Sequence, residues 1–144
     1  MQRSTRFLCD LAPAALAVAI DHWQGSPEHT QDAELRPLLP RLYETFLSES
    51  WEYRSRIIPV RASSVDGLRT VAAAGLIPDL VYLDADHSCD SVTADLIATL
   101  DLFPQTRIVG DDWNWDGVRR AVETVAEQRR LRVEVFGAAW RILR

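Results

Sequence analysis

The feature that most constrains this chain is a repeated unit in which a short apolar run ends at a polar residue and a helical pattern follows. The runs Leu16–Ile20, Ile57–Ala62, Leu80–Leu83 and Arg107–Val109 lead into Asp21, Ser63, Asp84 and the Gly110-Asp111-Asp112 step. Short continuous apolar runs bounded by turn signals are typical of strands buried on both faces of a parallel sheet. The repeat therefore predicts an α/β fold.

Apolar residues at helical spacing lie between these runs. They predict helices from Ser4 to Leu11, from Leu42 to about Trp51, from Ser63-Ser64 to Gly75, from Ser88 to Leu102, and around Val118, Val122 and Val125. The last two strands, Arg132–Phe136 and Ala139–Leu143, are joined through Gly137 and read as an antiparallel hairpin. We expect a single domain over residues 1–144, with a Rossmann-like, doubly wound, mostly parallel sheet covered by helices on both faces.

Charge and residue usage exclude several classes of partner and reaction. A formal net charge of -5 argues against nucleic acid, whose binding depends on clustered positive charge, and favours a small-molecule substrate. The chain has no lysine, which rules out Schiff-base chemistry and a Walker-type phosphate loop. Cys9 and Cys89 are far apart with no Cys-x-x-Cys spacing, so we expect free thiols.

No apolar run reaches the roughly 18–20 residues of a membrane span, and residues 1–6 lack the order of a signal peptide. We therefore expect a cytoplasmic protein with no membrane partner. The sequence leaves the oligomeric state open, a homo-oligomer included.

Asp84, Asp111 and Asp112 are the sharpest group of candidate site residues. In open α/β sheets, ligands bind beyond the carboxyl ends of the strands, and these three carboxylates should meet there. Gathered carboxylates repel one another unless a proton or a cation neutralises them, and oxygen donors suit Mg²⁺. The sequence thus predicts a magnesium site; the alternative is that Asp111 and Asp112 only cap the following turn.

His87, three residues after Asp84, is the candidate general base because the pKa of histidine is close to neutrality. The alternative is a histidine at a helix start with no catalytic role. His22 and His29 lie in the long polar segment from His22 to Pro40, which we expect to be a loop, and both are weaker candidates.

Asp21 has a different role available, because a carboxylate at the end of a strand in a nucleotide-binding fold can accept two hydrogen bonds from a ribose. His22 and Trp23 follow it directly and are placed with it at the predicted cofactor site. Trp23, Trp113 and Trp115 could flank an adenine or an aromatic substrate, or could simply pack.

Four segments in this order resemble a known family: Ala19–Trp23 (AIDHW), Pro78–Ser88 (PDLVYLDADHS), Val109–Asp112 (VGDD) and Gly117–Val122 (GVRRAV). The chain resembles, over nearly its whole length, class I S-adenosylmethionine-dependent methyltransferases of the bacterial group that includes macrolide sugar O-methyltransferases and cephalosporin-hydroxylase-like proteins. The motifs are specific as an ordered set and weakly specific one at a time.

The resemblance implies metal-assisted O-methylation of a small-molecule hydroxyl. It places the ribose of S-adenosyl-L-methionine at Asp21 and its adenine near Ser63, with Asp84 also at the cofactor. Asp84, Asp111 and Asp112 match the family's magnesium ligands, and His87 matches its general base. Where the family has Tyr-Glu after the His-Ser step, this chain has Cys89-Asp90, a mild departure.

A larger departure lies at the start. The resemblance implies a first strand and a glycine-rich cofactor loop, whereas Met1–Arg6 matches the end of that loop. In the family this strand lies between the second and the fourth, so we expect unpaired backbone in the sheet and weakened cofactor binding. The alternatives are a truncated or inactive methyltransferase-like module without catalysis and, less favoured, a magnesium-dependent phosphatase-like enzyme, which would need a basic residue that is usually lysine.

Overall fold

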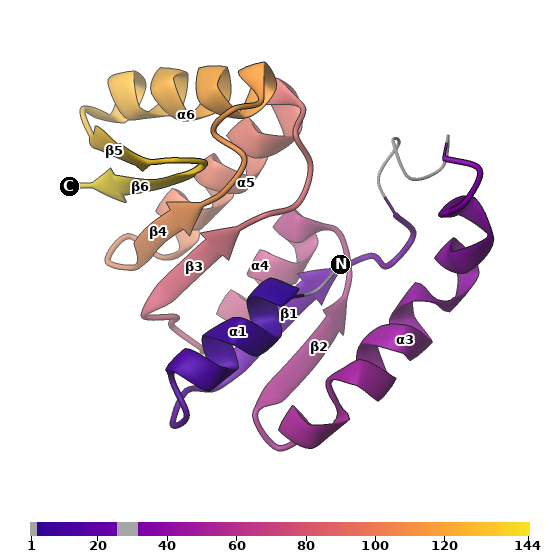
Figure 1. Cartoon of the computed structure of the whole chain (residues 1–144). Helices are drawn as coiled ribbons and strands as arrows, with labels where there is room; N and C mark the ends of the chain where they lie inside the picture. Colours follow the sequence, from indigo (N-terminus) through magenta and orange to yellow (C-terminus); the bar gives the residue numbers. More distant parts are fainter. Residues whose placement is uncertain (1–2, 26–31) are drawn as a thin grey trace. The chain divides into compact units, whose positions relative to one another are not determined.

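The computed structural model describes residues 3–25 and 32–144. The chain forms two compact units, Met1–Ser63 and Ser64–Arg144. His29 and the middle of the predicted loop lie outside the described residues. Helices and strands alternate along both units (Figure 1), as the sequence pattern predicts.

The first unit contains a two-stranded parallel sheet. Strand β1 (Ala17–Asp21) pairs with β2 (Ile57–Arg61), so that Ala17 lies opposite Ile57 and Asp21 opposite Arg61. The helical elements are α1 (Arg3–Leu11), α3 (Leu42–Glu49) and two short 3₁₀ helices, η1 (Arg36–Arg41) and η2 (Trp51–Tyr53). The predicted long loop therefore ends in a 3₁₀ helix, which tolerates Pro37 at its start.

A small hydrophobic core holds this unit together. Cys9 of α1, Trp23, Phe46 of α3 and Ile57 of β2 form one buried cluster. Burial raises the pKa of the Cys9 thiol because a thiolate is poorly solvated there. Both cysteines are free thiols, as expected.

The second unit contains a four-stranded sheet in the order β3-β4-β6-β5. Its strands are β3 (Leu80–Leu83), β4 (Arg107–Gly110), β5 (Arg132–Phe136) and β6 (Ala139–Leu143), and its helices are α4 (Ser64–Ala73), α5 (Cys89–Leu102) and α6 (Asp116–Arg129). Strands β3 and β4 are parallel, whereas β6 is antiparallel to both β4 and β5. The predicted C-terminal hairpin is confirmed, with Gly137 in the left-handed region (φ 65°).

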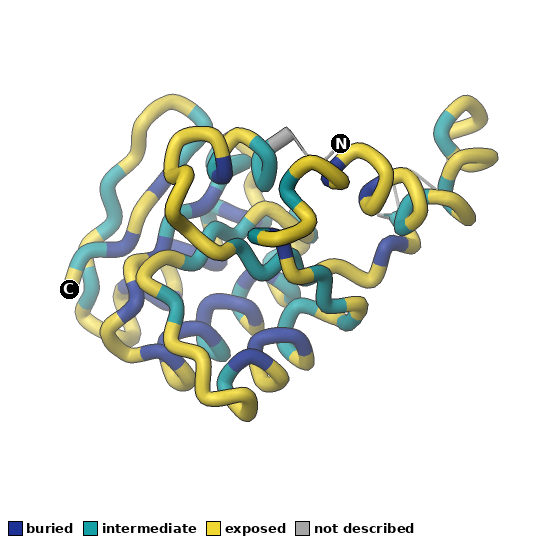
Figure 2. Tube along the Cα trace, turned by 90° about the horizontal axis from the view of Figure 1, so that it is seen from below, coloured by how far each residue is buried: buried dark blue, intermediate teal, exposed yellow. Residues whose placement is uncertain are grey.

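Helices α5 and α6 bury their apolar faces against one face of this sheet. The core combines side chains from both helices with Ile108 of β4 and Trp140 and Ile142 of β6. Buried residues recur along these elements (dark blue in Figure 2) at the helical and strand periods that the sequence shows. Fully burying a side chain such as Leu96 contributes about 1.5–3 kcal/mol.

The expected single sheet is present as two sheets in the part of the chain that the structure describes. In that part of the chain, β1 pairs only with β2, and β3 pairs only with β4, so each of β1 and β3 has one edge without a strand partner. The architecture is mixed α/β with parallel pairs and an antiparallel hairpin. No helix among the described residues is both long enough and apolar enough to cross a membrane.

Candidate functional site

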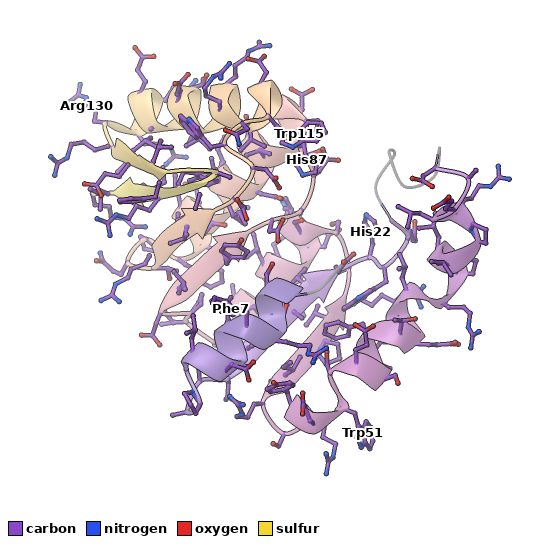
Figure 3. The ribbon with its side chains drawn as sticks, viewed as in Figure 1. Phe7, His22, Trp51, His87, Trp115 and Arg130 are labelled. Atoms are coloured by element: carbon purple, nitrogen blue, oxygen red, sulfur yellow. The ribbon has the colours of Figure 1, made fainter. Side chains whose placement is uncertain are left out.

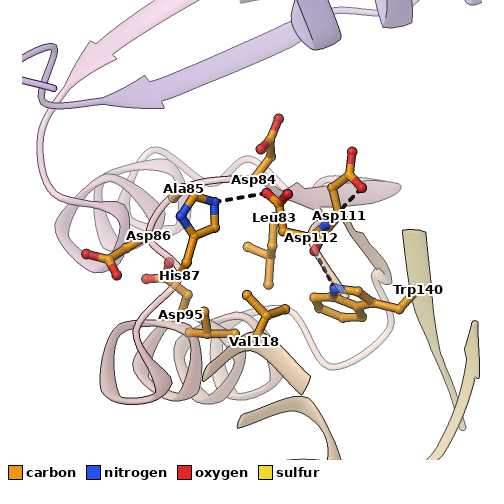
Figure 4. A pocket seen from close by; sticks show the side chains of 11 residues that line it. Leu83, Asp84, Ala85, Asp86, His87, Asp95, Asp111, Asp112, Val118 and Trp140 are labelled. Carbon is orange, nitrogen blue, oxygen red and sulfur yellow. Dashed lines mark hydrogen bonds and ion pairs between the residues drawn. The ribbon is translucent and has the colours of Figure 1, made fainter. Parts of the chain in front are cut away.

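The carboxyl ends of β3 and β4 bring four of the predicted site residues into one pocket. Leu83 lies opposite Gly110 in the parallel register, so Asp84 and Asp111 follow neighbouring strands at the same edge. Asp84, His87, Asp111 and Asp112 all line the cavity (Figure 4), together with Asp86 and Asp95. The cavity volume, about 10 Å³, is room for one water-sized group.

Backbone and indole contacts fix the end of β4. The Asp111 N–H donates to the Leu83 carbonyl (3.1 Å), and the Trp140 indole N–H donates to the Asp111 carbonyl (2.8 Å). A Cβ on Gly110 would collide with the Trp140 ring, so glycine is required where the indole crosses the strand. These contacts hold the Asp111-Asp112 step against the sheet.

The two carboxylates of this step have different partners. Asp111 accepts hydrogen bonds from the Tyr82 hydroxyl (3.1 Å) and from the Asp112 N–H (2.9 Å). Asp112 Oδ2 lies 3.0 Å from His87 Nε2. Asp112 has a φ of 62°, in the left-handed region that few residues other than glycine adopt.

His87 is held on several sides. Its ring stacks on Trp115 with the centroids 4.5 Å apart and the planes 12° from parallel, and Figure 3 shows the two side chains next to each other. A Cβ on Gly117 would collide with the His87 carbonyl, so glycine lets the first turn of α6 approach the β3–α5 loop. His87 Nδ1 is buried and has no hydrogen-bond partner among the described residues.

The β3–α5 loop is also ordered by hydrogen bonds. The Ser88 hydroxyl caps α5 by accepting from the Ser91 N–H (3.3 Å), as the sequence predicts. Asp86 accepts from the Ser88 N–H (2.6 Å), and that hydrogen bond lowers the pKa of Asp86. Hydrogen bonds at Asp86 and Ser88, the two neighbours of His87, therefore fix the loop that carries it.

Asp95 is a pocket residue that the sequence reading missed. It lies on α5, is only 7% exposed, and has a pKa raised to about 6, mainly by burial, while a hydrogen bond from Ser64 opposes the rise. Helical spacing from Val92 to Leu96 and Thr99 places residue 95 on the buried face. That spacing was the signal that could have identified it.

The predicted cofactor residues of the first unit follow its two paired strands. Asp21 ends β1, its side chain is half-exposed, and its Oδ1 accepts from the Trp23 N–H (2.7 Å). The Ala62 N–H donates to the Asp21 carbonyl (3.1 Å), and the exposed Ser63 comes next. Asp21 and Ser63 therefore lie at the same edge of the β1–β2 pair, as the sequence predicts.

His22 and Trp23 differ from each other in their surroundings. The His22 ring is half-exposed, and its Nδ1 accepts a hydrogen bond from the Gln24 N–H (2.9 Å). Because an accepting nitrogen carries no proton, the 3.7 Å approach of Nδ1 to Asp21 is not an ion pair.

Trp23 is 4% exposed and packs on Tyr43 and Phe46. Its ring is a core residue here, with no face open to a ligand. Trp113 packs against the core of the second unit, which leaves Trp115 as the exposed tryptophan of the predicted three.

The carboxylates do not form a ready-made metal site in this arrangement. Among residues 3–25 and 32–144, no three His, Cys, Asp or Glu side chains are grouped so that they could hold a metal ion. Asp112 faces His87, and both oxygens of Asp111 accept hydrogen bonds. The donor chemistry suits magnesium, but the geometry does not, and the magnesium ligands stay a prediction.

Comparisons with known proteins support the fold. No family model matches the chain, and no curated protein matches it. Two solved structures of CalS11, a TDP-rhamnose 3′-O-methyltransferase of calicheamicin biosynthesis, match 98% of this chain at 15% identity, with TM-scores of 0.55 and 0.58. A protein from Corynebacterium glutamicum matches 99% of this chain at 17% identity, with a TM-score of 0.51.

The matched regions differ in how much of each neighbour they cover. This chain spans 64% and 65% of the two CalS11 chains, less than two thirds of their length, and 80% of the C. glutamicum protein. At these identities the likeness concerns the fold. The chain has the Rossmann-like architecture found in these neighbours, one of which is named as a methyltransferase.

Proposed function

We propose that the chain is an S-adenosyl-L-methionine-dependent methyltransferase that transfers a methyl group to a hydroxyl of a small molecule. The observation that carries this proposal is the gathering of His87 with Asp84, Asp111 and Asp112 at the carboxyl ends of β3 and β4. In a Rossmann-like sheet this edge is where ligands bind. The likeness to CalS11 supports the same class of reaction.

Asp21 and Ser63 are the residues that would hold the nucleoside part of the cofactor. A half-exposed carboxylate at the end of β1 fits the two hydroxyls of a ribose, which can both donate to it. His22 is exposed enough to border this site, and the assignment of Asp84 to the cofactor stays a prediction. When bound, S-adenosyl-L-methionine supplies an electrophilic methyl group.

His87 is the group that would accept the proton of the substrate hydroxyl. Histidine is the side chain that most often serves as a general base, and positioning of the acceptor oxygen supplies much of the acceleration. The resemblance also implies metal assistance, but Asp112, one of the predicted ligands, is engaged by His87.

The proposal is tested by measuring S-adenosylhomocysteine formation from S-adenosyl-L-methionine and hydroxylated acceptors. The name of CalS11 makes TDP-rhamnose and related nucleotide sugars the first acceptors to try. His87→Gln should reduce the rate by about 10²–10⁴-fold, the usual contribution of a general base.

Asp79→Asn is the matched control, because Asp79 is exposed and precedes β3, whereas His87 follows it. It should leave the rate unchanged. A purified, folded chain that yields no S-adenosylhomocysteine with any acceptor would favour the non-catalytic alternative.

A further inference from the structure

Strand β5 forms one edge of the second sheet, and no described strand lies on its outer side. The sheet order is β3-β4-β6-β5, so β5 pairs with β6 alone among the described residues (Figure 1). Bulges and prolines are two of the devices that keep an open edge from pairing with another chain. The pairing of β5 runs without a gap from Arg132 to Phe136, and the strand contains no proline. Its open edge can therefore accept a further strand.

The hairpin turn decides which backbone groups of β5 point toward this edge. Residues 137–138 form a two-residue turn that is closed by Phe136 and Ala139, and the closing pair of such a turn is hydrogen-bonded. Hydrogen-bonded and non-hydrogen-bonded pairs alternate along antiparallel strands. The even-numbered residues of β5 therefore bond to β6, whereas the backbone N–H and C=O groups of Val133 and Val135 face the open edge.

The side chains of β5 alternate between an apolar face and a charged face. Val133 packs against the core of the second unit, and Val135, on the same face, is 41% exposed. The opposite face carries the exposed Arg132 and the half-buried Glu134. Glu134 accepts a hydrogen bond from Arg141 of β6 (2.8 Å from Nε), and a carboxylate has further lone pairs for a second donor.

Two antiparallel copies of β5 complement each other when their two-fold axis passes beside Val133. Each Val133 then lies opposite its own counterpart, and the two exchange backbone hydrogen bonds. Each Arg132 lies opposite the Glu134 of the second copy, a pairing of opposite charges that stabilises neighbouring strands. Leu131, which directly precedes the strand, lies opposite Val135, so the exposed valine gains an apolar neighbour.

The neighbouring registers lack this complementarity. A shift by one residue places Val133 opposite Glu134 or Arg132, so that an apolar face meets a charged one. A shift by two residues places Glu134 opposite Glu134, or Arg132 opposite Arg132, and like charges in these positions destabilise the pairing. The charge pattern of β5 therefore favours a second copy of the same strand in a single register.

We propose that the edge of β5 is a self-association surface. Two copies of this chain pair through antiparallel β5 strands centred on Val133, which joins their four-stranded sheets into one continuous sheet. The inference does not depend on the proposed function, because β5 and β3 lie at opposite ends of the sheet and the candidate site follows β3 and β4.

Amide hydrogen exchange at increasing chain concentration tests the edge directly. Between micromolar and millimolar concentrations, the Val133 and Val135 amides should exchange more slowly, because their hydrogen bonds form only in the paired state. The Glu134 and Phe136 amides bond to β6 in the single chain and should change little. Sedimentation velocity over the same concentrations should show a monomer–dimer equilibrium.

Charge reversal tests the contribution of the side chains. Arg132→Glu should weaken dimerisation about tenfold, because two attractive cross-strand pairs become two repulsive ones. Arg107→Glu makes the same change at an exposed position of β4, which lies inside the sheet. This control should dimerise as the wild type does.

Cysteine cross-linking tests the register. Opposed residues in a non-hydrogen-bonded pair have Cα atoms about 4.5 Å apart, within the range that a disulfide spans. A mixture of Arg132→Cys and Glu134→Cys chains should therefore form a mixed disulfide dimer. Either variant alone should cross-link less, because its cysteine lies diagonally from its counterpart. The wild type, with Cys9 and Cys89, gives the background.

Three outcomes would overturn the proposal. The chain could stay monomeric at millimolar concentration, or it could dimerise without slower exchange at Val133 and Val135. The third is a mixed disulfide that forms no faster than the disulfides of the single variants. Each outcome is read without cofactor or acceptor, so it is separate from a failure of the methyltransferase assay.

Discussion

At the scale of single residues, Asp95 shows how a helix can bury a carboxylate beside a candidate site. It lies among Val92, Leu96 and Thr99 on the inner face of α5, and its hydrogen-bond partner is Ser64 at the start of α4. Burial penalises the charged form, and the nearby Asp86 adds to the effect. The carboxyl group is therefore easier to protonate in the folded chain than in the unfolded chain.

This raised pKa predicts a specific dependence of stability on pH. The ordinary value is 3.8 and the folded value is about 6, so the folded state binds the proton more tightly. The contribution to the free energy of unfolding is fully present below about pH 3.8, declines as pH rises, and is lost above about pH 6. It amounts to at most about 3 kcal/mol.

Asp95→Asn should remove this contribution, because an amide does not ionise. Urea unfolding of both proteins between about pH 4 and pH 7 measures it: the stability of the variant relative to the wild type should rise as pH increases. Asp101→Asn, on the exposed side of the same helix, is the control and should lack this trend. Parallel pH curves for Asp95→Asn and wild type would contradict the assignment.

Individual site residues differ in how far the sequence could predict them. Asp84 and Asp111 directly follow β3 and β4, and the strand pattern was enough to predict that these carboxylates and Asp112 lie at one edge, where His87 joins them. The His87–Asp112 contact depends on a left-handed residue and on the Trp115 stack, neither of which leaves a pattern in the sequence. The sequence reading placed Trp23 at the ligand site, whereas its ring lies in the core. An aromatic residue after a strand gives the same sequence pattern whether its ring binds a ligand or packs in the core.

At the scale of elements, the ends of helices follow local chemistry that can be read directly. Ser88 caps α5, and Gly75 (φ 74°) follows α4, both as predicted. Helix α6 ends differently: Arg130 adopts a φ of 56°, and the Leu131 N–H reaches back to the Ala126 carbonyl (2.8 Å). Glycine is the residue that adopts this conformation without strain.

Arg130→Gly should therefore stabilise the protein. Removing a left-handed non-glycine residue is expected to raise the free energy of unfolding by about 1 kcal/mol, measured by chemical denaturation. The neighbouring Arg129 has a helical conformation and an ion pair to Asp101 (2.9 Å). Arg129→Gly should lower the free energy of unfolding by about 1 kcal/mol, and an equal loss in both variants would refute the explanation.

At the scale of the whole molecule, the order of the strands in the sheets could not be predicted from the sequence. The residue ranges of β3, β5 and β6 match the prediction, and β1, β2 and β4 differ by a residue or so, because apolar runs and turn residues are local signals. Pairing is not local. The described residues form two sheets, with β1 and β3 at the end of one sheet each, and no pattern within a strand says which neighbour it will have.

The central claim is that ligands bind at the carboxyl ends of the parallel strands in both units. The most direct measurement is mapping of backbone amide shifts during titration with S-adenosyl-L-methionine, which detects weak binding as well as tight binding. The account predicts changes at Asp21, Ser63, Asp84 and Asp111. Changes concentrated at Asp79 and Thr106, beside the opposite ends of β3 and β4, or no change at saturating cofactor, would contradict it.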